Sequence, residues 1–268
     1  MRGRKSHIET LCALATLALM TAAVMTVAVP AECGDGFLIP GVALSDAVFE
    51  VGAWCRYLVV DEVMGVSDTT IVYLAVTGTV ESKGSPAWWL ELESTPKGSP
   101  PEQKELAKAL VSSAVKNVAP GDSLVQFVTE LYLKKGSGPV EQADPSGLKQ
   151  LTLSNPTPDS EWTVKHGVNI DTPNGSFVGD YKHLTVTDDR EIDMGRVTLI
   201  KNDTDVFDVW LSDEVPIFRV VKCDIERVRD SRTVPEVPGI PGKEREQSRT
   251  TVELVSFGKD ATSKIQIP

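Results

Sequence analysis

A chain of 268 residues with 38 acidic and 27 basic side chains carries a formal net charge of −11 at pH 7. This charge excludes nucleic acid and anionic lipid headgroups as partners of the protein surface, because both repel an acidic chain. The length is sufficient for one large β domain with a sizeable core, since sandwiches and barrels commonly reach this size.

The first residues have the pattern of an export signal. Arg2, Arg4 and Lys5 form a basic start, and residues 11–29 carry no charge and are rich in Ala, Leu, Val and Met. Small residues end at Ala31, after which we expect a signal peptidase to cleave. The alternative is an uncleaved membrane anchor, because a segment of this length can span a bilayer. Either way we expect an exported protein of the periplasm or cell envelope.

Three cysteines follow the expected cleavage site, at Cys33, Cys55 and Cys223. Cys33 is a poor lipidation site, because Glu32 stands where a lipoprotein signal requires a small residue. An oxidising compartment permits one disulfide, and Cys55 and Cys223 could form it. Both could equally be small buried hydrophobic side chains, and their spacing does not decide between these alternatives.

Regular structure is expected to start near Phe49, after an extended N-terminal arm over residues 32–48. Three strands follow, over residues 51–60, 68–81 and 86–94, where aromatic and β-branched residues are frequent. The third strand alternates with a period of two. Its apolar face, which should be buried, consists of Trp88, Leu90 and Leu92. Its other face, which should meet solvent, consists of Trp89, Glu91 and Glu93.

One short helix is expected over residues 102–111. Pro100 and Pro101 precede this segment, and acidic residues near its start are a helix-start signal. Apolar residues also recur at helical spacing, namely Leu106, Ala109, Leu110 and Ala114.

The rest of the chain returns to strand patterns. Residues 143–160 are expected to form a loop, and residues 229–248 an exposed, mobile insertion, because both segments are rich in residues that break regular structure. Thr172-Pro173-Asn174-Gly175 is typical of a hairpin turn. Strands are expected over residues 124–134, 162–170, 176–187, 195–201, 205–212, 217–228, 251–257 and 262–267.

These elements predict an α+β chain that is mainly antiparallel β, with roughly ten strands and one or two short helices. Residues 49–268 form one domain in this interpretation. Composition by itself allows a sandwich, a closed barrel or a half-open barrel.

Six short blocks narrow the choice, because their order resembles the LolA/LolB-like superfamily of exported bacterial half-barrel proteins, the outer-membrane lipoprotein-sorting carriers and their relatives. The similarity extends from about Val51 to Ile267. The insertion at 229–248 departs from it, as does Phe218-Arg219, where many relatives have a small residue or glycine. The blocks are Gly52, Trp54 and Tyr57; Trp88-Trp89-Leu90-Glu91-Leu92; Thr172-Pro173 with Gly175 and Phe177; Val209-Trp210 with Ser212, Val215 and Pro216; Val221-Lys222; and Glu253-Leu254 with Gly258.

The resemblance implies an apolar concave face that holds acyl chains beneath a helical lid. We therefore expect a half-open β-barrel covered by one or two short helices, with a lipid, acyl chain or lipoprotein as ligand. The alternative is an ordinary packed core, because alternating faces indicate burial and not a cavity. The candidate lining residues are Leu58, Val60, Val72, Leu74, Trp88, Leu90, Phe127, Leu131, Val209 and Leu211.

Motifs for catalysis or metal binding are absent from the sequence. Beyond the expected signal the chain has two histidines, His166 and His183, and no zinc, phosphate-loop or nucleophile-elbow pattern. A single histidine on a strand is more often a hydrogen-bonded surface residue than a ligand. We therefore expect a non-enzymatic protein without cofactor or metal. Its alternative role is that of a structural or interaction protein with a filled barrel and an envelope protein as partner.

Overall fold

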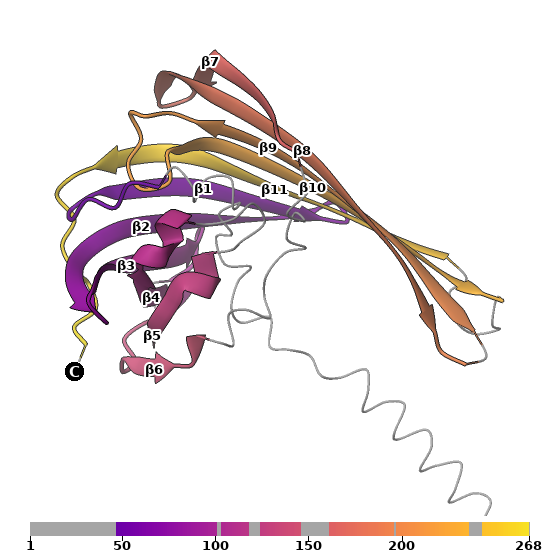
Figure 1. Ribbon diagram of the computed structural model, residues 1–268, viewed down its shortest axis with the longest axis horizontal. Coiled ribbons are helices and arrows are strands. Elements are labelled where there is room, and N and C mark those ends of the chain that lie inside the picture. The colour runs from indigo at the N-terminus through magenta and orange to yellow at the C-terminus, as the bar shows by residue number, and fades with distance from the viewer. Residues whose placement is uncertain are drawn as a thin grey trace, which may run out of the picture. The chain divides into compact units, whose positions relative to one another are not determined.

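The computed structural model describes residues 47–100, 103–117, 124–145, 161–195, 197–235 and 243–267. Three expected features lie outside these residues: the signal segment, Cys33 and most of the extended N-terminal segment 32–48. The described residues belong to one compact unit, Phe37–Pro268. Their main element is a single antiparallel sheet of 11 strands (Figure 1).

Strands make up nearly all of the regular structure, with two short 3₁₀ helices between β4 and β5. The elements are β1 (Trp54–Val63), β2 (Val66–Ser82), β3 (Ser85–Pro96), β4 (Glu105–Ser112), η2 (Ser113–Asn117), η3 (Leu124–Phe127), β5 (Val128–Lys135), β6 (Glu141–Ala143), β7 (Thr163–Thr172), β8 (Gly175–Asp193), β9 (Thr198–Leu211), β10 (Val220–Val234) and β11 (Lys243–Gly258).

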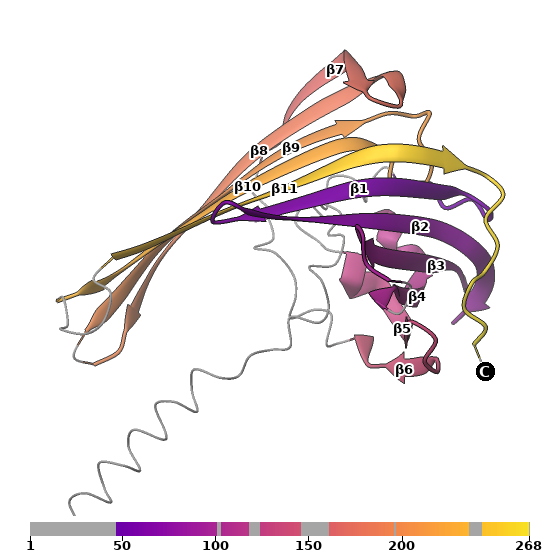
Figure 2. The ribbon, with the colours of Figure 1, turned by 180° about the vertical axis from the view of Figure 1, so that it is seen from behind.

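The strand order is β6-β5-β4-β3-β2-β1-β11-β10-β9-β8-β7, and every neighbouring pair is antiparallel. The chain therefore runs outward from β1 to one edge and returns from the opposite edge, β7, to the centre. There β11 pairs with β1. The sheet is curved and open, and the view from behind in Figure 2 shows how β1 to β6 bend around one side. This agrees with the predicted antiparallel, half-barrel-like architecture.

Tight turns connect the first strands. Val63 pairs with Val66 across Met64-Gly65, and Ser82 pairs with Ser85 across Lys83-Gly84. All four turn residues have positive φ, between 52° and 82°. Two-residue hairpins with positive φ at both positions twist in the same sense as the flanking strands, so these turns fix the register of β1, β2 and β3. The predicted hairpin at Thr172 and Gly175 is confirmed by the pairing of these residues.

The predicted helix over 102–111 is wrong, because residues 105–112 form strand β4. This strand pairs with β3 and β5. Leu106 and Leu110 are buried on one face, while Val111 is buried on the other. The good helix formers in this segment are overridden by pairing and burial on both sides, since propensity is a weak prior against tertiary contacts. No long helix covers the sheet among the described residues.

Other boundaries also differ from the predictions, and the strands expected over 195–201 and 205–212 are one strand, β9. Leu124–Phe127 is a 3₁₀ turn, so β5 begins at Val128. Residues 262–267 are not a strand. Residues 229–234 and 243–248 are regular parts of β10 and β11, so the expected insertion is largely a paired hairpin. Whether it is mobile stays a prediction.

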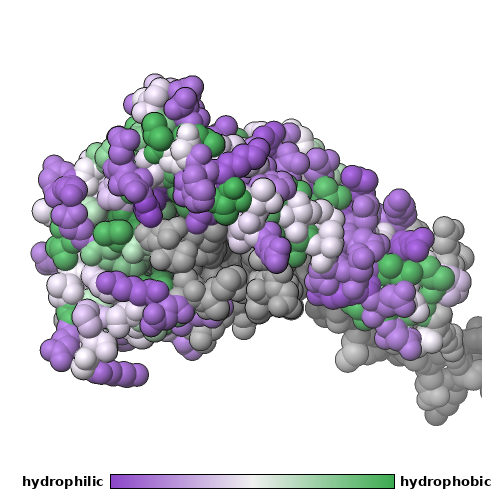
Figure 3. Space-filling model, turned by 45° about the horizontal axis from the view of Figure 1, so that its top comes forward, coloured by the Kyte–Doolittle hydropathy of each residue, from purple (hydrophilic) through white to green (hydrophobic). Residues whose placement is uncertain are grey.

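The distal ends of β8 to β11 form a four-stranded extension that we call the arm, comprising residues 188–193, 198–203, 229–234 and 243–246. Here β8 extends beyond its pairing with β7, and β11 extends beyond its pairing with β1. Figure 1 shows the arm projecting away from β1 to β6. Figure 3 shows hydrophilic side chains interspersed with smaller hydrophobic groups on its visible face. Charged side chains on such edges disfavour pairing with another chain.

Ion pairs replace apolar packing where the arm begins. Asp205 is only 2% exposed and accepts a hydrogen bond of 2.6 Å from Nη1 of Arg229. Asp203 lies 3.2 Å from Nη2 of Arg190 and 3.8 Å from Nε of Arg229. These side chains continue the face that carries Phe207 in the core. The buried carboxylate is thus compensated by a paired guanidinium, as burial of a charge requires.

Candidate functional site

The curved sheet brings most of the predicted lining residues onto one apolar face. Rows of directly paired residues place them together: Leu90 lies beside Ala109, which lies beside Leu131, and Val209 lies beside Cys223. Phe127 packs against this face from η3 and is half-buried. The buried members, at 0–8% exposure, are Val72, Leu74, Trp88, Leu90, Leu131, Val209 and Leu211.

The other two candidates, Leu58 and Val60, lie on the opposite, outer face. Tyr57 and Val59 occupy the inner positions of β1 and are 0% and 6% exposed. Leu58 is instead paired with Glu253 in the neighbouring strand and is only half-buried. Because residues 57–60 are apolar or aromatic throughout, the sequence does not indicate which alternate side chains of β1 face the core. The pairing of β1 with β2 and β11 decides which side chains point inward.

A loop between β9 and β10, residues 212–219, packs into the inner face, and we call it the plug loop. Val215, Ile217 and Phe218 are at most 1% exposed. Phe218 contacts Phe49 edge to face, with ring centroids 5.8 Å apart, and Phe49 lies 5.0 Å from the ring of Trp88. The plug loop therefore fills space that a ligand of the inner face would occupy.

Three hydrogen bonds hold the plug loop and the start of β10 to β1 and to the residues that precede β1. The Sγ of Cys55 donates to the carbonyl of Pro216 at 3.3 Å, and the hydroxyl of Tyr57 donates to the carbonyl of Val220 at 3.3 Å. The N–H of Val48 donates to the carbonyl of Ile217 at 2.8 Å. These contacts bind the loop at its middle and its end.

The plug loop has a strained backbone. Ile217 and Arg219 have φ values of 67° and 62°, in the left-handed region. A β-branched residue there is a genuine outlier, and each such residue costs about 1–3 kcal/mol.

Both described thiols are unpaired and buried. Cys55 and Cys223 are free, so of the two alternatives drawn from the sequence the small buried hydrophobe is correct. Burial raises the pKa of Cys55 to about 12, although a hydrogen bond with Tyr57 opposes this. Burial also raises the pKa of Cys223, together with the charges of two nearby aspartates. A thiol that stays protonated is a poor nucleophile and a poor metal ligand.

A shallow hollow of about 430 Å³ lies outside the inner face, at the end of β11 beside the plug loop. Four of its five charged residues pair within the wall: Lys259 Nζ lies 2.9 Å from Glu50, and Arg219 contacts Asp213. None of the ten predicted residues belongs to it. Its lining is Val48, Glu50, Asp213, Glu214, Val215, Pro216, Arg219, Phe257, Gly258 and Lys259.

Both histidines contact carboxylates, as expected of hydrogen-bonded surface residues: His166 is exposed, and His183 lies on the outer face of the sheet. Nδ1 of His166 is 3.0 Å from Asp180, and Nδ1 of His183 is 2.8 Å from Oδ1 of Asp208. Tyr181 donates to the same Asp208 oxygen at 2.5 Å, and this hydrogen bond raises the pKa of Tyr181 to about 12. The contact of His183 with Asp208 joins directly paired residues of β8 and β9, whereas His166 lies where the β7–β8 register is interrupted.

A buried ion pair on the outer face was not predicted from the sequence. Glu91 and Lys108 are 3% and 7% exposed, and Lys108 Nζ lies 3.0 Å from Glu91 Oε1. Glu91 was expected to meet solvent, and this expectation is wrong. The pair forms because Glu91 lies directly opposite Lys108 in the β3–β4 register, which the sequence does not reveal.

Within the described ranges, no cluster of three or more His, Cys, Asp or Glu side chains could hold a metal ion. The same ranges contain no helix that is long and apolar enough to cross a membrane.

Comparisons with known proteins give little further information. No protein-family model matches the chain. No curated protein is similar to it in sequence. Among solved structures, a DUF1329 family protein from Desulfovibrio piger ATCC 29098 matches with 7% identity and a TM-score of 0.29, over 82% of this chain and 90% of that one. At this TM-score the similarity supports no conclusion about function.

Proposed function

We propose that this protein is a non-enzymatic interaction protein of the cell envelope, in which the curved sheet is a packed scaffold and its outer surface meets protein partners. The observation that carries this proposal is the burial of the inner face. Seven of the predicted lining residues are at most 8% exposed, and Val215, Ile217 and Phe218 of the plug loop pack into the same core.

A lipid carrier needs apolar surface that its ligand can reach. Pockets for small molecules typically measure about 300–1,000 Å³ and are lined mainly by apolar side chains. The hollow of about 430 Å³ is at the rim, and its wall includes three carboxylates and two basic groups. A hydrophobic chain would have to desolvate these charges there, which is unfavourable. The inner face in this conformation belongs to the protein's own core.

The second candidate is an acyl-chain or lipoprotein carrier seen in a closed state. One observation favours it: Ile217 and Arg219 hold the plug loop in a strained backbone directly over the inner face. Strain of this kind often occurs in segments that move in function. Displacement of the plug loop would release the strain and uncover apolar residues of the core into which Val215, Ile217 and Phe218 pack.

Native mass spectrometry of the protein purified from its own cell envelope separates the two candidates. A packed scaffold gives the mass of the polypeptide alone, and solvent extraction releases no stoichiometric lipid. The carrier predicts an additional lipid mass at one equivalent. The control is a Leu211→Trp variant whose fold is verified by circular dichroism and whose larger side chain crowds the inner face. A lipid mass in the wild type that disappears in this folded variant would establish the carrier and overturn the scaffold.

A further inference from the structure

The arm has two sheet edges that no described strand covers. In β8, residues 188–193 lie beyond the pairing with β7, and in β11, residues 243–246 lie beyond the pairing with β1. Each strand is paired on its other side, β8 with β9 and β11 with β10. The main-chain N–H and C=O groups on the free side of both strands are therefore open to another strand.

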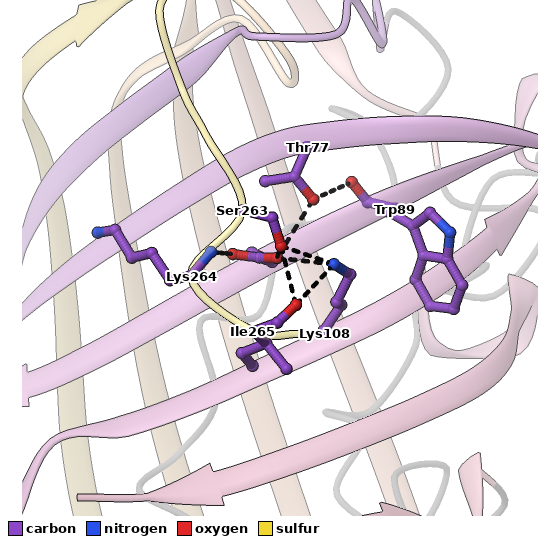
Figure 4. A network of polar contacts seen from close by, with 7 residues as sticks. Thr77, Trp89, Lys108, Ser263, Lys264 and Ile265 are labelled. Atoms are coloured by element: carbon purple, nitrogen blue, oxygen red, sulfur yellow. Dashed lines mark hydrogen bonds and ion pairs between the residues drawn. The ribbon is translucent and has the colours of Figure 1, made fainter. Parts of the chain in front are cut away.

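Elsewhere on the sheet, main-chain groups outside the strand ladder are satisfied within the chain. On the outer face of β3 and β4, Glu91 accepts the N–H of Lys264 at 2.7 Å, and Lys108 donates to the carbonyl of Ile265 at 3.0 Å (Figure 4). The free edges of the arm differ, because the described residues supply no neighbouring strand for them.

The turn from β8 into β9 shows which groups of β8 point to its free side. The N–H of Met194 donates to the carbonyl of Val197 at 2.9 Å, so the main-chain groups of Met194 point toward β9. Such groups alternate between the two sides of a strand, and the β8–β9 pairing is regular up to Asp193. Asp193 and Glu191 therefore direct their N–H and C=O groups to the free side, and both are exposed acids.

The free side of β11 is basic at the corresponding positions. The N–H of Met64, in the turn between β1 and β2, donates to the carbonyl of Gln247 at 3.2 Å, so Gln247 points away from β10. By the same alternation Arg245 and Lys243 direct their main-chain groups to the free side. Their exposed side chains lie on the outer face of the arm, as do the two acids of β8.

A second copy of the chain fits these edges. β8 and β11 run antiparallel to each other, so β8 of one copy beside β11 of another continues the antiparallel sheet with the outer faces on the same side. When Glu191 lies opposite Arg245, three of the four facing residue pairs combine opposite charges, which stabilise strand pairing. The pairs are Glu191 with Arg245, Asp193 with Lys243, Arg190 with Glu246, and Ile192 with Glu244.

The same charges disfavour the pairing of two identical edges. Two β8 edges would place Glu191 opposite Glu191, and two β11 edges would place Arg245 opposite Arg245. Like charges directly opposite one another destabilise a strand pair. The charges that keep an arbitrary strand away from the arm therefore still admit the unlike edge of a second copy.

We infer that the arm is a self-assembly element, in which β8 of one copy pairs with β11 of the next. Neighbouring strands are rotated by about 20–25°, so the four strands of the arm rotate successive copies by about 80–100° and the rest of each molecule diverges from the shared sheet. Because the two edges in contact are different, the contact extends to a ring or a chain of copies.

The association should be weak and reversible, because four residue pairs form a contact far smaller than a standard interface of about 1,600 Å². The inference does not rest on the proposed scaffold function, since neither edge belongs to the buried core. It names a second copy of the chain as a partner of the arm.

Sedimentation velocity of the wild-type protein tests the inference over concentrations from about 10 μM to 1 mM, the range of weak association. The weight-average sedimentation coefficient should rise with concentration, and added salt should reduce this rise because the charge pairs are exposed. A monomer at every concentration overturns the inference.

Charge reversal at one edge identifies the surface. Glu191→Lys with Asp193→Lys, or Lys243→Glu with Arg245→Glu, should weaken self-association about tenfold or more, because each change makes the two edges alike in charge. An equimolar mixture of the two variants should associate as the wild type does, since each altered edge matches one of the other variant. The control is Asp68→Lys with Glu81→Lys, a change at exposed acids of β2, which should associate no more weakly than the wild type.

Unchanged association of the folded arm variants overturns the inference, and so does a mixture that fails to restore it. If a variant does not fold, cross-linking of the wild type decides. Carbodiimide treatment of mixed unlabelled and ¹⁵N-labelled chains should join Lys243 of one copy to Glu191 or Asp193 of another, and absence of this mixed peptide overturns the inference. A lipid in the inner face changes none of these outcomes, so the scaffold and the self-assembly are tested separately.

Discussion

Replacement of Leu90 by alanine tests whether the inner face is a packed core. Leu90 is 4% exposed and lies between Val76 of β2 and Ala109 of β4. Truncation of a fully buried leucine removes its transfer free energy and leaves a cavity, at a cost of about 2–5 kcal/mol. In a domain of this size each kcal/mol lowers the melting temperature by about 2–4 °C, so we expect a decrease of about 4–20 °C.

The matched control is Ile71→Ala in β2, because Ile71 is 37% exposed on the outer face. This change should cost no more than about 1 kcal/mol, the span of strand propensities measured in a host protein. Urea denaturation monitored by circular dichroism measures both variants, and the m value should stay unchanged. If Leu90→Ala costs no more than Ile71→Ala, the inner face is an open wall and the reasoning for a packed scaffold is refuted.

Three other predictions concern charge, thiols and the arm. Burial opposes ionisation of Glu93, but hydrogen bonds from two lysines and their charges lower the pKa of this carboxyl below its ordinary value. The ionised carboxylate therefore stabilises the fold above pH 4.5, and this stabilisation is lost as pH falls through the lowered pKa. The difference in unfolding free energy between wild type and Glu93→Gln should shrink from pH 7 to pH 3, and a constant difference would contradict this. With all other cysteines replaced by serine, Cys55 and Cys223 should react with a maleimide only after denaturant is added, as measured by mass; rapid labelling of the native protein would show that the core opens. Replacing residues 189–202 and 231–244 each by Asn-Gly joins strands already paired in register and keeps the ion pair of Asp205 with Arg229, so one cooperative melting transition should remain. Its loss would show that the outer part of the arm supports the core.

Much of the sheet could be predicted because its strands carry local signals. The alternation around Trp88 gave the correct faces for the two tryptophans of β3: Trp88 is 8% exposed and Trp89 is half-buried. Asn174-Gly175 also marked a real hairpin. Such features depend on neighbours within a few residues, which a single sequence contains.

Features that depend on strand pairing could not be predicted. Residues 105–112 satisfy helical and alternating patterns at once, and only the neighbouring strands select β4. The Glu91–Lys108 ion pair and the outward position of Leu58 likewise follow from register. In the sequence the plug loop was apparent only as a Val-Pro block, because its packing depends on side chains that are distant along the chain.

The central position of β1 has a consequence for the order in which the fold can form. β1 can pair with β2 as soon as both exist, but its other edge waits for β11, the last strand of the sheet. Until then Tyr57 and Val59 lie beside an edge of free N–H and C=O groups, which is a template for unwanted pairing. Contacts of such large sequence separation also form slowly. We therefore expect newly made chains to need protection of the β1 edge until β11 closes it, and chains cut before β11 to aggregate.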